Sequence, residues 1–282
     1  MNSQIDWSSE QWDQIQQIVA DEVNKVSVAG SFLACCGPLE RSATVVRSQQ
    51  LSEESNSITV DDVNTLKLWT LAVHVELKQR QLAEEHLTGA MSAFRRAANI
   101  LARAEDAIVF NGLPREDPET ADLETAKVPT QCKVTGGDTT HGLDGAGRNH
   151  PPILNPNQRN LVADIARAIA TLESSGHLGP FACILGHSAF IAANTPSGDA
   201  FVLPKDRIEP MLGTQLLRSS TLDDEQVVVV SLAGDPIDLV VATSPTVQFL
   251  NVSNEARYRF RVYEKFVLRI KEEGAVTAFT LS

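Results

Sequence analysis

The sequence predicts an α+β fold, with helices in the middle of the chain and strands around them. Residues 257–271 alternate: the even positions are apolar except for Glu264, and most odd positions are Arg or Lys. A period of two is typical of a strand with one face on a core. Residues 81–110 instead repeat apolar side chains every three or four positions, which predicts a helix. Shorter apolar runs bounded by turn residues predict further antiparallel strands in the last third of the chain.

The first half of the chain begins with an amphipathic helix over residues 8–26, which follows a capping signal at Ser8-Ser9. Residues 48–63 are polar and rich in Ser and Glu, so we expect an exposed arm there. The alternation in residues 66–77 changes phase near Trp69, which predicts a strand with a bend. This strand leads into the helix of residues 81–110, which Gly112 ends.

The second half begins with residues 113–157, which are rich in Pro, Gly, Asp and Thr and show little periodicity. We expect a surface insertion there, because unstructured loops of this length are uncommon inside compact domains. A helix is predicted next, at residues 160–174. The predicted strands that follow are residues 181–185, 227–232, 238–242, 247–250 and 258–270.

Composition limits the class of protein. The chain has 282 residues, 43% of them hydrophobic, and resembles an ordinary globular protein. It has no apolar run of membrane-spanning length and no signal or transit peptide, so we predict a cytoplasmic protein with no membrane partner. Four cysteines without CxxC spacing predict free thiols. The net charge of −12 argues against a nucleic-acid partner.

No catalytic, metal or cofactor site is predicted, and we do not expect an enzyme. His187 and Ser188 follow a strand like a nucleophile elbow, but Phe190 stands where the sharp turn needs a small residue. The glycines at 142, 145 and 147 are expected in a loop, because no predicted strand precedes them and no predicted helix follows. The residues Asp138, His141 and His150 lack metal-ligand spacing, so a solvated loop is the better interpretation.

Several motifs occur in an order that resembles a known family. These motifs are spread along nearly the whole chain. In order they are Gln11-Trp12, Gly37-Pro38, the helix end from Ala104-Glu105-Asp106 to Gly112, the strand from Gly179-Pro180-Phe181, and the strands near Gly234-Asp235 and Tyr263-Glu264. Together they resemble the encapsulins, the linocin-type shell proteins of bacterial nanocompartments.

This resemblance implies a tailed-phage major-capsid-like fold with a peripheral domain, an axial domain and an extended loop. It also implies self-assembly into a closed icosahedral shell around cargo enzymes of the ferritin-like or dye-decolorising peroxidase type, which targeting peptides dock inside. The implied segments are residues 1–47 (helix and arm), 48–72 (extended loop), 73–157 (peripheral domain with the spine helix and the insertion 113–157), 158–222 (axial domain) and 223–282 (peripheral strands).

The resemblance also assigns roles to residues. The stripe Ile15, Val19 and Val23 is implied to form the cargo groove. Arg80 stands where some relatives carry a flavin-binding tryptophan, so no flavin is expected. The pore-lining loop is implied to be Asn194, Thr195, Pro196, Ser197, Gly198 and Asp199.

Independent physical reasoning adds further expectations. A subunit built from a long strand, a long helix and an arm exposes much surface that one chain cannot bury by itself. Such a subunit is expected to self-associate. The carboxylates Glu105 and Glu264 interrupt apolar faces, so we expect each in a structural ion pair. The exposed side chains of Arg259 and Arg261 are candidates for subunit contact. Two alternatives stay open: a phage major capsid protein that packages DNA, and a hydrolase or bacteriocin that uses Ser188 with His187.

Overall fold

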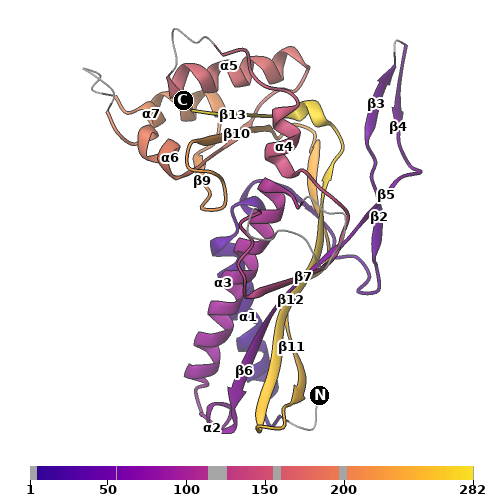
Figure 1. The fold of residues 1–282 in the computed structure, drawn as a ribbon, viewed down its shortest axis with the longest axis vertical. Coiled ribbons are helices and arrows are strands. Elements are labelled where there is room, and N and C mark those ends of the chain that lie inside the picture. The colour runs from indigo at the N-terminus through magenta and orange to yellow at the C-terminus, as the bar shows by residue number, and fades with distance from the viewer. Residues whose placement is uncertain (1–4, 55, 114–125, 155–159, 197–201, 282) are drawn as a thin grey trace.

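The computed structural model describes residues 5–54, 56–113, 126–154, 160–196 and 202–281 (Figure 1). The helices are α1 (Ser9–Val26), α2 (Gln79–Leu82), α3 (Thr88–Asn111), α4 (Gly142–Arg148), α5 (Leu161–Ser174), α6 (His187–Ala193) and α7 (Pro204–Leu212), with 3-10 turns at Ala29–Ser31 and Glu273–Ala275. The strands are β1 (Ala34–Cys36), β2 (Val45–Arg47), β3 (Leu51–Glu54), β4 (Ser57–Val60), β5 (Thr65–Lys67), β6 (Trp69–Lys78), β7 (Cys132–Gly136), β8 (Phe181–Leu185), β9 (Leu216–Arg218), β10 (Gln226–Ser231), β11 (Ile237–Val252), β12 (Arg257–Ile270) and β13 (Val276–Thr280).

The molecule is elongated and has two cores. In the lower body of Figure 1, α1 and α3 cover a five-stranded sheet of order β1-β11-β12-β6-β7. In the upper body, α4 to α7 surround a four-stranded sheet of order β13-β10-β8-β9. One apolar cluster fills the lower body and extends onto one face of the upper sheet, through Ile184, Val228 and Val230, and the second cluster packs on the opposite face of that sheet. The predicted α+β class is therefore confirmed.

The lower core forms because amphipathic helices pack on an amphipathic sheet. The predicted first helix is confirmed, and Ser8 caps it by accepting a hydrogen bond from the Gln11 backbone N–H. Aromatic rings fill the space between α1, α3 and β12: the Phe260 ring stacks on Trp7 at a centroid distance of 5.4 Å and meets Phe94 edge-on at 5.3 Å. These contacts fix α1 against the sheet.

The long alternating segment is β12, which pairs antiparallel with both β6 and β11. Its even positions from Phe260 to Leu268 are buried, as the period of two predicts. Arg269 departs from the pattern, because this odd-position side chain is buried rather than solvated. Its guanidinium donates to both oxygens of Asp238, with Nε–Oδ1 at 2.9 Å and Nη2–Oδ2 at 2.6 Å.

Residues 113–157, expected to form a surface insertion with little periodicity, contain regular structure in much of their described part. Residues 132–136 form β7, an edge strand of the lower sheet, and residues 142–148 form α4. The glycines placed in a loop therefore belong to a helix that follows a strand. Gly147 is needed for close packing, because an added Cβ would lie 2.7 Å from the Ala278 backbone nitrogen. Such a glycine-rich helix has no apolar periodicity to detect.

The expected grouping of residues 223–282 as peripheral strands is also wrong in part. Strands β10 and β13 pair with each other and belong to the upper sheet, with β8. The two predicted strands at 238–242 and 247–250 are one strand, β11, with irregularities in its register against β12. Apolar runs predict strands, but they do not show which sheet each strand joins.

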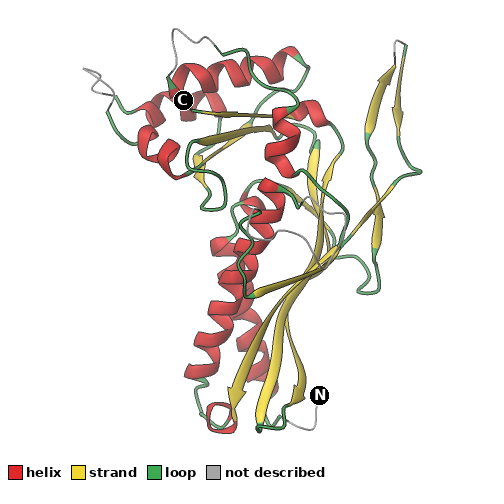
Figure 2. Ribbon diagram, in the orientation of Figure 1, coloured by secondary structure: helices red, strands yellow, loops and turns green. Residues whose placement is uncertain are grey.

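The predicted arm is a two-part ladder whose outer part projects away from the body (Figure 2). Strand β2 pairs with β5 at its base, and β3 pairs with β4 further out. The ladder is longer than the predicted residues 48–63, since it begins at Val45 and ends at Lys67. The bend expected near Trp69 is confirmed, because Leu68 separates β5 from β6.

Candidate functional site

A groove opens on the lower body between α1, β1 and β11, with a cavity volume of about 500 Å³. We call it the α1–β11 groove. Its rim includes the exposed residues Asn24 and Ser244. Its remaining lining is mostly small or apolar and consists of Ala20, Val23, Ser27, Gly30, Leu33, Cys35, Glu105, Leu239, Val241, Pro245 and Glu264.

Two buried carboxyl groups, Glu105 from α3 and Glu264 from β12, lie in this lining. The Ser27 hydroxyl donates to Glu105 Oε1 at 2.8 Å. Glu264 is 2% exposed, and its Oε1 has no hydrogen-bond partner among the described residues. The expected ion pairs are wrong, because no basic side chain in the described ranges pairs with either group and the two carboxyls contact each other instead.

Burial and mutual repulsion keep this pair from losing both protons. The pKa of Glu264 is raised well above 4.5, first by burial and then by the charge of Glu105. Burial also raises the pKa of Glu105, whereas hydrogen bonds from Ser27 and Glu264 oppose that rise. Glu264 is therefore the member of the pair that keeps its proton to higher pH, and that proton points toward the Glu105 carboxylate.

Asp106 lies beside the pair and anchors the turn that follows α1. It accepts backbone N–H groups from Val28 at 3.1 and 3.0 Å and from Ala29 at 2.9 Å. Burial raises its pKa to about 7, with a further contribution from the charge of Glu105, while the N–H donors act in the opposite direction. The Cys35 thiol across the groove also has a raised pKa, from burial and then from Glu105. Every titratable group in the groove lining is therefore a carboxyl or a thiol.

The helix residues expected to form a cargo groove lie mostly in the core. Ile15 and Val19 are 0% exposed, so the expectation that their side chains line an open surface is wrong. Val23 is buried but does contribute to the α1–β11 groove. The amphipathic pattern identifies a buried face, and α3 and the sheet occupy that face in this chain.

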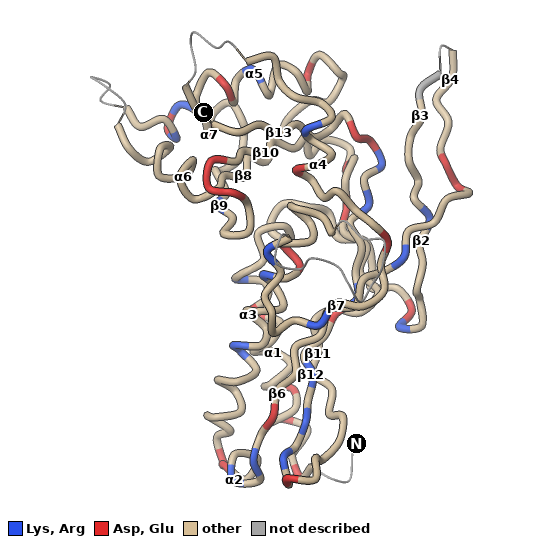
Figure 3. Tube along the Cα trace, viewed as in Figure 1, with Lys and Arg blue, Asp and Glu red and all other residues tan. Residues whose placement is uncertain are grey.

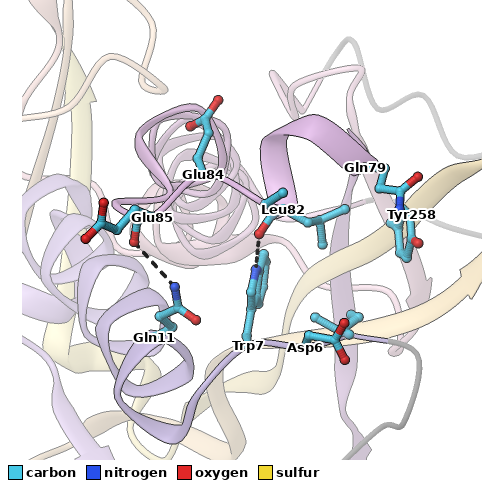
Figure 4. Close-up of a pocket in the computed structure, with 10 residues that line it drawn as sticks. Asp6, Trp7, Gln11, Gln79, Leu82, Glu84, Glu85 and Tyr258 are labelled. Carbon is cyan, nitrogen blue, oxygen red and sulfur yellow. Dashed lines mark hydrogen bonds between the residues drawn. The ribbon is translucent and has the colours of Figure 1, made fainter.

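A second, smaller pocket of about 290 Å³ lies near α2 at the end of the lower body (Figure 4). Trp7 Nε1 donates to the Leu82 carbonyl at 3.0 Å, and Gln11 Nε2 donates to the Glu85 carbonyl at 3.4 Å. These bonds tie the start of α1 to the α2–α3 connection. The charged side chains in its lining are all acidic, and Arg80 is not among them.

The candidate subunit-contact residues lie on the outer face of β12. Arg259 Nε is 2.9 Å from Glu76 Oε1 on β6, and Arg261 donates to Gln248 Oε1 at 2.8 and 2.6 Å. Figure 3 shows basic positions along β12 beside an acidic position on β6. Side chains of the neighbouring strands β6 and β11 therefore already bind the guanidinium groups of Arg259 and Arg261. Contact of Arg259 and Arg261 with another subunit stays a prediction.

The candidate pore loop begins at the end of α6. The Asn194 side chain donates to the Phe190 carbonyl at 2.9 Å, and the Thr195 hydroxyl donates to the Ile191 carbonyl at 2.8 Å. Pro196 is the last described residue here. The other predicted loop residues, Ser197, Gly198 and Asp199, lie outside the described residues.

The structure gives no support to a hydrolytic site at Ser188. Ser188 and His187 are both exposed in the first turn of α6, and no hydrogen bond joins their side chains in the part of the chain that is described. Gly186 is explained by packing, because an added Cβ would collide with the Asp223 carbonyl. Within the described ranges, no cluster of His, Cys, Asp and Glu could hold a metal ion. None of the helices described has the length and apolarity to span a membrane.

Comparison with known sequences identifies related proteins. The profile of the Linocin_M18 family, described as encapsulating protein for peroxidase, matches residues 1–126 and 135–267. The type 1 encapsulin shell protein EncA of Myxococcus xanthus is 28% identical over 66% of this chain, and the match spans 58% of that protein. A diheme-cytochrome-encapsulin shell fusion protein of Kuenenia stuttgartiensis is 22% identical over 98% of this chain and 74% of that protein.

Solved structures share the fold at low sequence identity. A virus-like particle subunit from Pyrococcus furiosus superposes with a TM-score of 0.69 at 15% identity, covering 96% of this chain and 99% of that one. The SrpI encapsulin of Synechococcus elongatus gives 0.57 at 12% identity, covering 91% and 88%. A Myoviridae phage capsid gives 0.56 at 15% identity, covering 88% and 89%. The predicted tailed-phage capsid fold is confirmed.

Proposed function

Because the chain belongs to the Linocin_M18 family of encapsulating shell proteins, we propose that its copies assemble into a closed shell around a cargo enzyme. The family match over most of the chain is the observation that carries this proposal. Encapsulin shell proteins are structural, so the chemistry belongs to the cargo. Exposed free thiols at Cys35 and Cys36 fit a reducing compartment, and we place the shell in the cytoplasm.

The arm supports assembly because it cannot bury its own apolar surface. Ile58, Val60 and Val63 are all exposed on or beside the outer hairpin, and Val63 is 84% exposed. The hairpin touches the body at its base, where the Leu51 N–H donates to the Lys271 carbonyl at 2.8 Å, and its outer part projects away (Figure 2). A second copy of the chain can cover these side chains and add the burial that one subunit lacks. The proposed shell is therefore a homo-oligomer in which each arm lies on a neighbour.

The α1–β11 groove is the proposed docking site for a targeting peptide on the cargo. Its walls from β11 and the 30–35 segment are mostly apolar, and its volume suits a few peptide side chains. The family description names a peroxidase, and one relative is named as a cytochrome fusion. We therefore propose a redox enzyme as cargo, of the dye-decolorising peroxidase or ferritin-like type.

Blocking the groove tests the docking proposal. The substitution Ala20→Trp places a large ring in the groove, whereas Gln14→Trp adds the same ring on an exposed part of α1 outside the groove lining. Shells of each variant would be purified from the cells in which the chain occurs naturally, and protease-protected proteins inside them would be identified by mass spectrometry. We expect Gln14→Trp shells to keep their cargo and Ala20→Trp shells to lose it. Full cargo in both variants would refute docking in this groove.

The phage-capsid alternative needs its own test because phage capsids share the fold. The family match and the net charge of −12 favour a protein shell that does not package DNA. Purified particles treated with nuclease outside should therefore show a protein-like ratio of absorbance at 260 and 280 nm. Long protected DNA inside the particles would favour the phage capsid.

A further inference from the structure

We propose that the Glu105–Glu264 pair in the α1–β11 groove is a cation site, which takes the ammonium or guanidinium group of a basic side chain in the docked peptide. This inference rests on the proposed docking function and specifies the chemistry of the peptide. It predicts that the groove selects a Lys or Arg at one peptide position and that the bound cation replaces the proton held by Glu264.

The first support is an incomplete hydrogen-bond set. Glu264 Oε1 is buried, borders the groove and has no partner among the described residues. A buried carboxyl oxygen without a partner is unfavourable, so such an oxygen is a natural point for a ligand donor. Glu105 Oε1 already accepts from the Ser27 hydroxyl at 2.8 Å, which fixes the neighbouring carboxylate in place.

The second support is the sign of the charges around the groove. No Lys, Arg or His of the described chain belongs to its lining. Outside the pair, the groups whose charge raises the pKa of Glu264 or of the Cys35 thiol are Asp106 from α3, Asp238 from β11 and Cys36 from β1. None of these groups is basic. The Asp238 charge is balanced by Arg269 and Lys271, with N–O distances of 2.6 and 3.3 Å. The Glu105–Glu264 pair has no such partner among the described residues.

The shape of the groove suits a long basic side chain. The side chains of Val23, Leu33 and Leu239 are buried and line the same groove as the two carboxyl groups. Lys and Arg bury an apolar stem and place the charge at its end. A basic side chain can thus satisfy both parts of the lining, whereas an apolar side chain would leave Glu264 Oε1 without a donor.

The exchange of proton for cation keeps the charge of the site constant. With one proton shared between the two carboxyls, the charge of the pair before binding is −1. After binding, Glu264 has released its proton to solvent, the two carboxylates carry two negative charges, and the ligand adds one positive charge. The net charge is again −1, so the buried site gains a hydrogen-bond donor without a change in net charge.

A peptide library tests the inference with its own readout. Green fluorescent protein with twelve randomised residues at its C-terminus would be co-expressed with the shell, and the peptides retained inside purified shells would be sequenced. We expect enrichment of Lys or Arg at one position beside apolar residues. In a retained peptide, replacing that Lys by Met should lower loading about tenfold, as expected for the loss of a charged hydrogen bond.

Matched shell variants assign the effect to the pair. In Glu264→Gln shells the Lys and Met peptides should load about equally, whereas Glu76→Gln shells, changed at an exposed carboxylate on β6, should keep the tenfold preference. Apolar enrichment without a basic position would overturn the cation site but leave peptide docking intact. Retention of no peptide at all would count against docking itself, and would overturn both.

A second measurement does not depend on the folding of Glu264→Gln. Cys35 lines the groove, and Cys36 is the only other exposed cysteine of the four. In a Cys36→Ser shell, the reaction of Cys35 with a maleimide should slow when the Lys peptide is loaded. An unchanged rate in loaded shells would show that the peptide binds elsewhere and would overturn the inference.

Discussion

Replacing Glu264 by Gln should make the stability of the protein less dependent on pH. In the folded chain, burial and the charge of Glu105 raise the pKa of Glu264 well above 4.5, whereas the unfolded chain ionises this group near 4.5. Above that pH the folded state keeps a proton that the unfolded state releases. Raising the pH therefore lowers the free energy of unfolding until the folded pKa is passed. The amide introduced by Glu264→Gln would carry a permanent donor toward Glu105 and no titrating proton.

The size of the effect follows from one proton. A difference of one bound proton changes the free energy of unfolding by about 1.4 kcal/mol per pH unit. Between about pH 5 and about pH 8 the largest loss from this group is therefore about 4 kcal/mol. For a chain of this size, the slope corresponds to about 3–6 °C in Tm per pH unit. The variant should be the more stable protein at the upper end of the range.

Thermal unfolding of assembled shells at fixed protein concentration measures this difference. The control is Glu76→Gln, because Glu76 is partly exposed and pairs with Arg259 rather than with another carboxyl. We expect the control profile to parallel the unmodified protein, and the Glu264→Gln profile to be flatter. Parallel profiles for all three proteins would refute the assignment of the proton to Glu264.

Three further variants test the fold and its edges. Phe260→Ala should lower the free energy of unfolding, measured by chemical denaturation, by about 3–5 kcal/mol. The reason is that the ring is fully buried among Trp7, Phe94 and Phe249. A loss below about 1 kcal/mol would show that this cluster is not tightly packed. Asp238→Asn should cost about 3 kcal/mol by the same measurement, since it breaks the buried pair with Arg269, and a neutral result would contradict that pairing. The combined change Arg259→Glu and Arg261→Glu should reduce the assembled fraction in size-exclusion chromatography while circular dichroism stays unchanged; normal shells would show that this face is only solvated.

Periodicity predicted the elements that bury one face. The 81–110 pattern appears as α2 and α3, and the 257–271 pattern appears as β12, because each presents a regular apolar face to one core. Ser8 and Gly112 also marked helix ends as predicted. Residues 113–157 were harder to predict, since α4 owes its position to glycines that allow close backbone packing rather than to an apolar stripe.

The candidate site depended on tertiary pairing that one sequence does not reveal. Glu105 and Glu264 were recognisable as polar residues on apolar faces, but their contact requires α3 to cross β12 at one register. Ile15 and Val19 were recognisable as a buried stripe, but not as one covered by the same chain. The groove itself combines short stretches from α1, β1 and β11 that are more than 200 positions apart at their extremes. Sequence patterns identify faces, and the fold decides which faces meet.

Electron microscopy of the purified protein tests the central claim most directly. We expect uniform, closed, hollow particles built from this single chain, and we expect Ile58→Asp with Val60→Asp on the exposed arm to yield folded subunits that do not close into particles. A protein that remains monomeric in solution, with no closed particles in the micrographs, would contradict the shell function.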